Sequence, residues 1–209
     1  MIAIDERLKI PEIPLYLGWI RGEVVMAGSE NWQRDYSFLR DMDYKNFPAI
    51  HGGRKLYRHF KKDPTRYRLS SEGMIRRIQR DKPLHAINRL VDIMNHYSII
   101  TGRPVGLYDF KKIRGPVEFT LGKASEVYEG VGRGLLNITD LPVLKDLEGP
   151  FGSPTSDSVR TATTMETGTF LSVVFCPMDP IGEEDLEALK RMIEAEVSVS
   201  QLTFGIVTS

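Results

Sequence analysis

The sequence predicts a protein that combines helices and strands (α/β in the broad sense, α+β in the strict one). We expect a β-rich core of mixed sheets flanked by helices, and a helical N-terminal portion. Between residues 105 and 175, short runs of β-branched and aromatic residues alternate with glycines and prolines, as in strands joined by turns. Residues 84–101 and 183–197 instead repeat apolar side chains every three or four positions, which indicates amphipathic helices. No internal repeat or linker divides the sequence, so we expect one domain over residues 1–209.

The first part of the chain changes character once. Residues 13–26 are rich in aromatic and β-branched residues and are interrupted by two glycines, which suits one or two short strands. Residues 30–82 form a basic portion that we expect to be helical, because Trp32, Tyr36 and Leu39 share one helix face. Prolines are expected to break this portion into separate segments.

A helix is predicted over residues 84–101. Leu90, Ile93 and Tyr97 fall at three- and four-residue spacing on one face. Gly102 provides the stop signal, because glycine adopts the left-handed conformation that often ends a helix.

The remaining elements follow from similar patterns. Three consecutive acidic residues from Glu183 complement the dipole of a helix that we expect to end near Val197. A last strand is predicted over residues 201–207. The chain is therefore expected to have a core over residues 85–177, followed by a C-terminal part over residues 183–207 that contains this helix and strand. The strands predicted within that core cover residues 105–109, 116–121, 126–129, 134–138, 143–147, 158–164 and 169–176.

Composition and signals bound the location of the protein. The one cysteine, Cys176, lies in an apolar run and is expected in the core of a protein from a reducing compartment. The N-terminus lacks the apolar run of a secretory signal, and no stretch reaches the length of a membrane span. We therefore expect a cytoplasmic protein with no membrane partner.

Charge is distributed unevenly although the net charge is zero. Between Arg54 and Lys82 there are 11 basic and 3 acidic residues, a local balance of +8, whereas Asp140 to Ser209 holds 4 basic and 12 acidic residues, a balance of −8. Such polarity can steer a polyanion to one face of a protein. The alternative is that these charges are simply the solvated faces of helices.

Common catalytic signatures are missing from the sequence. There is no Walker loop, dinucleotide fingerprint, nucleophile elbow or zinc-type cluster of cysteines and histidines. The glycines from Gly130 to Gly134 resemble a phosphate-binding loop but lack a following helix, so we predict a β-turn between strands there. No metal and no organic cofactor is expected.

One stretch carries motifs in an informative order. Asn95 lies seven residues before a Gly-x-Pro sequence, and an aromatic-Asp pair and a glycine-rich loop follow. This order resembles the tRNA-editing module of the phenylalanyl-tRNA synthetase β subunit, and more closely the free-standing proteins built from its third and fourth domains. The matching positions are Asn95, Gly102, Pro104, Tyr108, Asp109, Gly115, Gly152 and Ser156, with Glu126 at a further acidic position.

The resemblance covers residues 85–177 and implies both a fold and an activity. It implies an editing-domain-like fold and trans-acting hydrolysis of mischarged aminoacyl-tRNA, so that the protein would be an aminoacyl-tRNA deacylase and not a complete ligase. An aminoacyl ester is an activated bond, so a pocket that orients it beside one water molecule suffices without a side-chain nucleophile. The residues expected around the amino acid are Asn95, Tyr108, Ser153, Thr155, Ser156, Asp157, Thr163 and Thr164.

Two departures from the family pattern bear on specificity. Asp157 stands where the synthetase has a longer acidic residue that senses the hydroxyl group of a misattached tyrosine. Gly106 stands where the synthetase has a histidine and offers no side chain to a substrate. Asp157 and Arg160 are three residues apart in a predicted strand and point to opposite faces, which leaves Asp157 for a ligand.

Structural roles are the alternative for these residues. Asn95 can cap or tie together backbone amides, the loop of residues 153–157 can be a plain turn, and Asp109 at a strand end is expected to be structural.

The partners expected from the resemblance are tRNA or aminoacyl-tRNA and an amino acid or other small molecule in the pocket, with no DNA. Phosphate contacts dominate RNA affinity, and the basic residues just before the matched region are the candidates for them. They are Arg54, Lys55, Arg58, Arg76, Arg77 and Arg80. A non-catalytic amino-acid sensor and an RNA-binding protein with a vestigial pocket are the competing interpretations.

Overall fold

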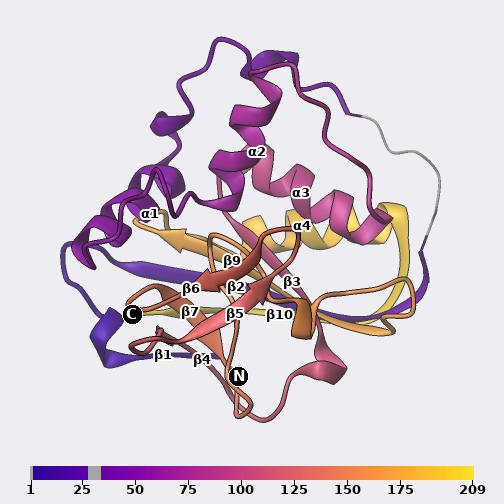
Figure 1. The fold of residues 1–209 in the computed structure, drawn as a ribbon. Helices are drawn as coiled ribbons and strands as arrows, with labels where there is room; N and C mark the ends of the chain where they lie inside the picture. The colour runs from indigo at the N-terminus through magenta and orange to yellow at the C-terminus, as the bar shows by residue number, and fades with distance from the viewer. Residues whose placement is uncertain (1, 28–33) are drawn as a thin grey trace.

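The computed structural model describes residues 2–27 and 34–209 and shows two sheets, a separate hairpin and four α-helices. In Figure 1 the helices lie on the upper side of the molecule and the sheets below them. Short 3-10 helices join the larger elements. They are η1 (Glu6–Leu8), η2 (Ser37–Leu39), η3 (Tyr44–Asn46), η4 (Phe110–Lys112) and η5 (Val159–Thr161).

The first sheet is antiparallel and built from segments that are distant in the sequence. Its strand order is β10 (Val197–Thr208), β2 (Leu15–Ala27), β9 (Thr169–Pro177) and β3 (Val105–Asp109). The strand β9 is buried along nearly its whole length, as its continuous apolar sequence predicts. The outer strand β3 leaves one edge to the segment that follows η5, where Ala162 pairs with Tyr108.

The second sheet packs against one face of the first. Its order is β1 (Ile2–Ile4), β4 (Val117–Leu121), β7 (Pro142–Lys145) and β8 (Pro150–Gly152), with β1 parallel to β4 and the other pairs antiparallel. An apolar core fills the space between the sheets, where the rings of Phe119 and Phe175 lie 5.4 Å apart.

Two helices cover the opposite face of the first sheet. These are α3 (Arg89–Thr101) and α4 (Glu183–Glu196), which bury Ile93 and Leu189 against residues of β2 and β9. Gly18 permits a close approach, because a Cβ atom there would lie 2.8 Å from Leu186. The sheet is therefore covered on both faces.

A third core lies beneath the basic helices. It joins α1 (Pro48–His59) and α2 (Ser70–Ile78) to the hairpin of β5 (Val127–Gly130) and β6 (Gly134–Asn137). Tyr57, Ile75, Ile99 and Tyr128 meet in this core, so α3 contributes to it as well as to the core beside the first sheet. Residues 131–133 form the turn of the hairpin, as the glycines predict.

The predicted α+β class is confirmed, and the differences lie in the bounds of elements. The prediction of a strand over residues 158–164 is wrong, because this segment contains η5 and makes only isolated bridges. The helix predicted from residue 84 begins only at Arg89, where the side chain of Asn88 caps it by accepting from the amide of Val91. β1 and β8 were not predicted, and β2 is one strand of 13 residues.

The basic portion is less helical than its sequence pattern predicts. Residues 34–47 contain only the turns η2 and η3 before α1 begins, and Trp32 lies outside the described residues. Within residues 2–27 and 34–209, no helix is long and apolar enough to cross a membrane.

Candidate functional site

Two hydrogen bonds hold the carboxyl group of Asp157 at the outer edge of β3. The hydroxyl group of Tyr108 donates to Oδ1 at 2.7 Å, and the backbone amide of Leu107 donates to Oδ2 at 3.3 Å. Tyr108 is fully buried, whereas Asp157 is half-buried. The resemblance places these two residues in one site, and the structure brings their side chains together.

Two glycines leave space for the side chain of Tyr108. A Cβ atom on Gly106 would lie 2.0 Å from the hydroxyl oxygen of Tyr108, and one on Gly152 would lie 2.2 Å from it. The Tyr108 ring also packs edge-on against Phe151, with 4.9 Å between the ring centroids. The departure at Gly106 therefore has a steric consequence, since a larger residue there would collide with Tyr108.

The loop before Asp157 is fixed by two further tyrosines. The hydroxyl group of Tyr57 lies 2.8 Å from Oγ1 of Thr155, and that of Tyr128 donates to the carbonyl oxygen of Ser156 at 2.6 Å. Ser153 is buried, and its hydroxyl group accepts from two amides of the same loop while donating to the Ser156 carbonyl. The side chains of Ser153 and Thr155 thus hold the loop together, and Ser156 is half-buried beside them.

Burial sets the proton affinity of this site. Loss of solvent raises the pKa of Asp157 to about 7, although the hydrogen bonds from Tyr108 and Leu107 act in the opposite direction. Burial also raises the pKa of Tyr108 and of Tyr128 above the ordinary tyrosine value, so both keep their protons and remain donors at neutral pH. Asp157 is therefore a group that can gain or lose a proton near neutrality.

Asp157 and Arg160 were expected to point to opposite faces of a strand, and the reason for this expectation is wrong. These residues do not alternate along a strand, because η5 begins directly after Ser158. Arg160 instead pairs with Asp146 at 2.9 Å and with Glu148 at 3.1 Å. The ion pairs of Arg160 are thus with Asp146 and Glu148. The carboxyl group of Asp157 instead accepts hydrogen bonds from Tyr108 and Leu107.

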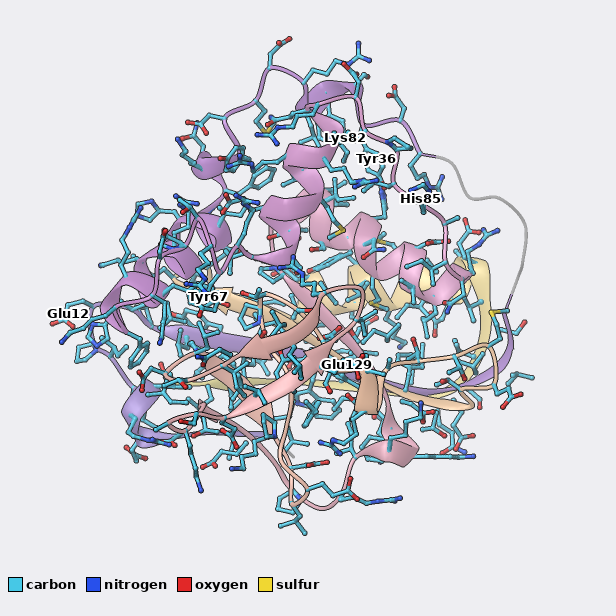
Figure 2. All side chains as sticks on the ribbon, in the orientation of Figure 1. Glu12, Tyr36, Tyr67, Lys82, His85 and Glu129 are labelled. Atoms are coloured by element: carbon cyan, nitrogen blue, oxygen red, sulfur yellow. The ribbon has the colours of Figure 1, made fainter. Side chains whose placement is uncertain are left out.

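One expected substrate contact, Asn95, lines a cavity whose lining residues do not include Tyr108 or Asp157. Asn95, on α3, lines a cavity of about 680 Å³ together with residues 34–37 and 81–86. Figure 2 shows Tyr36, Lys82 and His85 around this cavity on the upper side of the molecule, away from Glu129 on β5.

Thr163 and Thr164 follow Ala162, which pairs with Tyr108. Thr163 is half-buried and Thr164 is exposed. The amide of Thr164 donates to Thr167, whose hydroxyl group contacts Asp109 at 3.3 Å. Asp109 also accepts from the amide of Lys111 and so caps η4, a structural role as expected.

The candidate RNA contacts lie on α1 and α2, except Arg80, which lies two residues after the last residue of α2. Arg54 donates to both carboxylate oxygens of Glu72, and Arg76 donates to the hydroxyl group of Tyr44. Lys55 donates to the carbonyl oxygen of Glu12. The more exposed candidates are Arg58, Arg77 and Arg80, of which Arg77 donates to the carbonyl oxygen of Pro83.

Several groups in this site were not among the residues predicted from the sequence. Tyr57 and Tyr128 fit ordinary apolar patterns of a helix and a strand, and their contacts with the loop arise only from the packing of α1 and β5. The amide of Leu107 is a backbone group that no residue type marks. The aromatic hydroxyl groups on these two elements were the only available signal, because buried tyrosine hydroxyls normally find a partner.

Comparison with known families decides the relationship. The model of the B3/4 domain family matches residues 53–195, which is more than half of the chain. The chain belongs to the B3/4 domain family. The match includes the second half of α1, all of α2, the Tyr108–Asp157 site and nearly all of α4.

Solved structures provide a second comparison for this B3/4 domain. Sixteen chains match, among them an N-terminal fragment of the phenylalanyl-tRNA synthetase β subunit from Pyrococcus horikoshii. The two chains are 15% identical, and the alignment has a TM-score of 0.48 and covers 95% of this chain. The chain spans 50% of the length of that fragment. The search of curated proteins found no match to this chain.

Proposed function

We propose that this B3/4 domain hydrolyses the ester bond of mischarged aminoacyl-tRNA at the half-buried carboxyl group of Asp157, beside β3 and the loop of residues 153–157. The observation that carries the proposal is the carboxyl group of Asp157, which is oriented by Tyr108 and Leu107 and has its pKa raised by burial to about 7. A proton acceptor is most effective when its pKa lies near the working pH. Asp157 meets this requirement without a metal or cofactor.

The reaction requires one water molecule and one proton acceptor. The water oxygen attacks the ester carbonyl carbon while its proton passes to the ionised Asp157. The bond to the ribose oxygen then breaks, that oxygen takes up the proton held by Asp157, and free amino acid and tRNA are released while the Asp157 carboxylate is restored. Tyr108 remains protonated throughout and keeps the Asp157 carboxylate in position.

The position of the basic helices supports an RNA substrate. Tyr57 links α1 to the loop through Thr155, and the amide of Ser70 at the start of α2 donates to the carbonyl oxygen of Pro154 at 2.8 Å. The cations of α1 and α2 therefore belong to elements that touch the loop before Asp157. Phosphates bound by Arg54, Lys55, Arg58, Arg76, Arg77 or Arg80 would bring the end of a tRNA to this side of the molecule.

Deacylation of purified mischarged tRNAs tests the proposal, starting with tyrosyl-tRNA(Phe). We expect the wild-type protein to release the amino acid faster than buffer and Asp157→Asn to reduce that rate by about 100-fold or more, because the amide cannot accept the proton. Glu129→Gln is the matched control, since it removes one exposed carboxylate from the neighbouring β5. If all esters decay at the buffer rate, the proposed activity is wrong.

Comparison of Asp157→Asn with a further variant, Asp157→Ala, separates catalysis from recognition at Asp157. An amide can still hydrogen-bond the hydroxyl group of a tyrosyl ester, whereas Asp157→Ala cannot. If Asp157 only senses the amino acid, Asp157→Asn keeps most of the rate and only Asp157→Ala loses discrimination between tyrosyl and phenylalanyl esters. A fall in rate with both esters in Asp157→Asn supports proton transfer.

A second candidate function is a sensor of a free amino acid or related metabolite. The cavity beside Asn95 favours it, because about 680 Å³ lies within the range of small-molecule sites. Calorimetry with free amino acids and no RNA tests this function. Saturable binding that Asn95→Ala abolishes, together with no deacylation, would favour the sensor.

A further inference from the structure

A small hollow on the surface of α1 is lined entirely by basic side chains. Its volume is about 200 Å³, and the lining residues are Lys45, His51, Arg54 and Arg58. The last three are spaced by three and four positions on α1, which places them on one helix face. Lys45 comes from η3, so cations from two elements surround the same space.

Arg54 is held in place by a buried carboxylate. Its Nη1 donates to both oxygens of Glu72, at 3.0 and 2.9 Å, and the Glu72 side chain is 0% exposed. Arg68 and Arg76 also approach Glu72, at 3.4 and 3.7 Å. One carboxylate therefore faces three guanidinium groups, and this cluster keeps an excess of positive charge beside the hollow.

Nearby acidic groups reduce this excess without removing it. Asp43 accepts from the amide of Lys45, and Asp63 accepts from the amide and hydroxyl group of Thr65. Those hydrogen bonds lower the pKa of Asp63, and the charges of Arg54 and Arg58 act in the same direction. The lysines and arginines around the hollow still outnumber the carboxylates. The cations are Lys45, Arg54, Arg58, Arg68 and Arg76, and the carboxylates are Asp43, Asp63 and Glu72.

We propose that this hollow binds a phosphate group, and that the phosphate belongs to the backbone of the tRNA. Guanidinium groups bind phosphate oxygens with paired donors, and Arg54 is already oriented by Glu72. The inference deepens the proposed function and rests on it for the choice of RNA. It assigns Lys45 and His51 to a site that the spacing of arginines alone did not reveal.

Binding of uncharged tRNA tests the site without any deacylation step. The variant Lys45→Ala/Arg58→Ala removes two exposed cations of the hollow and keeps the buried pair of Arg54 and Glu72. The control Lys111→Ala/Lys123→Ala removes two exposed cations from the β-rich part of the same chain. We expect the first variant to bind tRNA at least about fivefold more weakly at low salt and to reduce the slope of affinity against salt by about one. The control should stay within about twofold of wild type.

A second measurement distinguishes the source of the phosphate. NMR titration of the His51 ring with inorganic phosphate measures binding of the free ion. If the ligand is free phosphate, this binding is saturable in the millimolar range and is lost in Lys45→Ala/Arg58→Ala. The tRNA affinity of that variant would then match the affinity of the control, which would overturn the choice of RNA. If neither tRNA nor phosphate binding differs between the two double variants, the site itself is wrong. Weaker tRNA binding by the first variant without any ester hydrolysis would uphold the site and reject the deacylase, whereas hydrolysis with equal tRNA binding by both would do the reverse.

Discussion

The burial of Asp157 should make unfolding depend on pH. The pKa of its carboxyl group rises from the ordinary value of 3.8 to about 7 because folding removes solvent from it. Below about pH 4 the group is protonated in the folded and the unfolded chain, and its contribution to stability is fully present. As the pH rises to about 7, the unfolded chain ionises first and this contribution is lost.

Replacement of the carboxyl group should remove that pH dependence. Linkage gives an upper limit of about 4 kcal/mol for a shift of this size, and Asp157→Asn carries no ionisable group at this position. We expect the free energy of unfolding of wild type, relative to Asp157→Asn, to fall by about 1–4 kcal/mol between pH 4 and pH 8. Urea titrations at both pH values measure this difference, and a constant difference would show that Asp157 ionises normally.

Crowding by the Tyr108 ring makes Gly106 of β3 much less replaceable than Gly73 of α2. A Cβ atom on Gly106 would lie 2.0 Å from the Tyr108 hydroxyl oxygen, so Gly106→Ala must displace Tyr108 and break its bond to Asp157. We expect a loss of about 1–3 kcal/mol in unfolding free energy. Gly73 on α2 has nothing within 4 Å of an added Cβ, and Gly73→Ala should instead stabilise the chain by about 0.5–1 kcal/mol. Equal urea midpoints for both variants and wild type would contradict this account.

The ends of the helices show which local signals suffice. Gly102 ends α3 in the left-handed conformation, at φ 71°, as the sequence predicts. The start of α3 was placed too early because Leu84 and Ile87 continue the apolar spacing, whereas a single side chain, that of Asn88, fixes the true start. The strand β10 begins at Val197 directly after α4, so no turn residue marks the change from helix to strand.

The candidate site depends on contacts that no local pattern contains. Tyr108 and Asp157 are 49 residues apart, and only the family resemblance placed them together. The hydroxyl groups of Tyr57 and Tyr128 reach the same loop from α1 and β5. These two elements meet in the third core, beneath the basic helices. Sequence periodicity predicts that such residues are buried, but it does not predict which polar group each one meets.

The cations proposed to bind RNA are different groups from the Asp157 carboxylate, and this division predicts how salt affects the proposed reaction. The chain has no net charge, so attraction of RNA depends on the local excess of cations between Arg54 and Lys82. Salt screens these exposed cations, whereas the hydrogen bond from Tyr108 to Asp157 is 2.7 Å long and partly shielded from solvent. We expect an increase from 50 to 200 mM salt to raise KM for mischarged tRNA by about tenfold or more while kcat changes less than about twofold. Single-turnover and steady-state rates at both salt concentrations measure this split. A fall in kcat with constant KM would mean that salt acts on the chemical step, and that the basic helices do not supply the affinity for RNA.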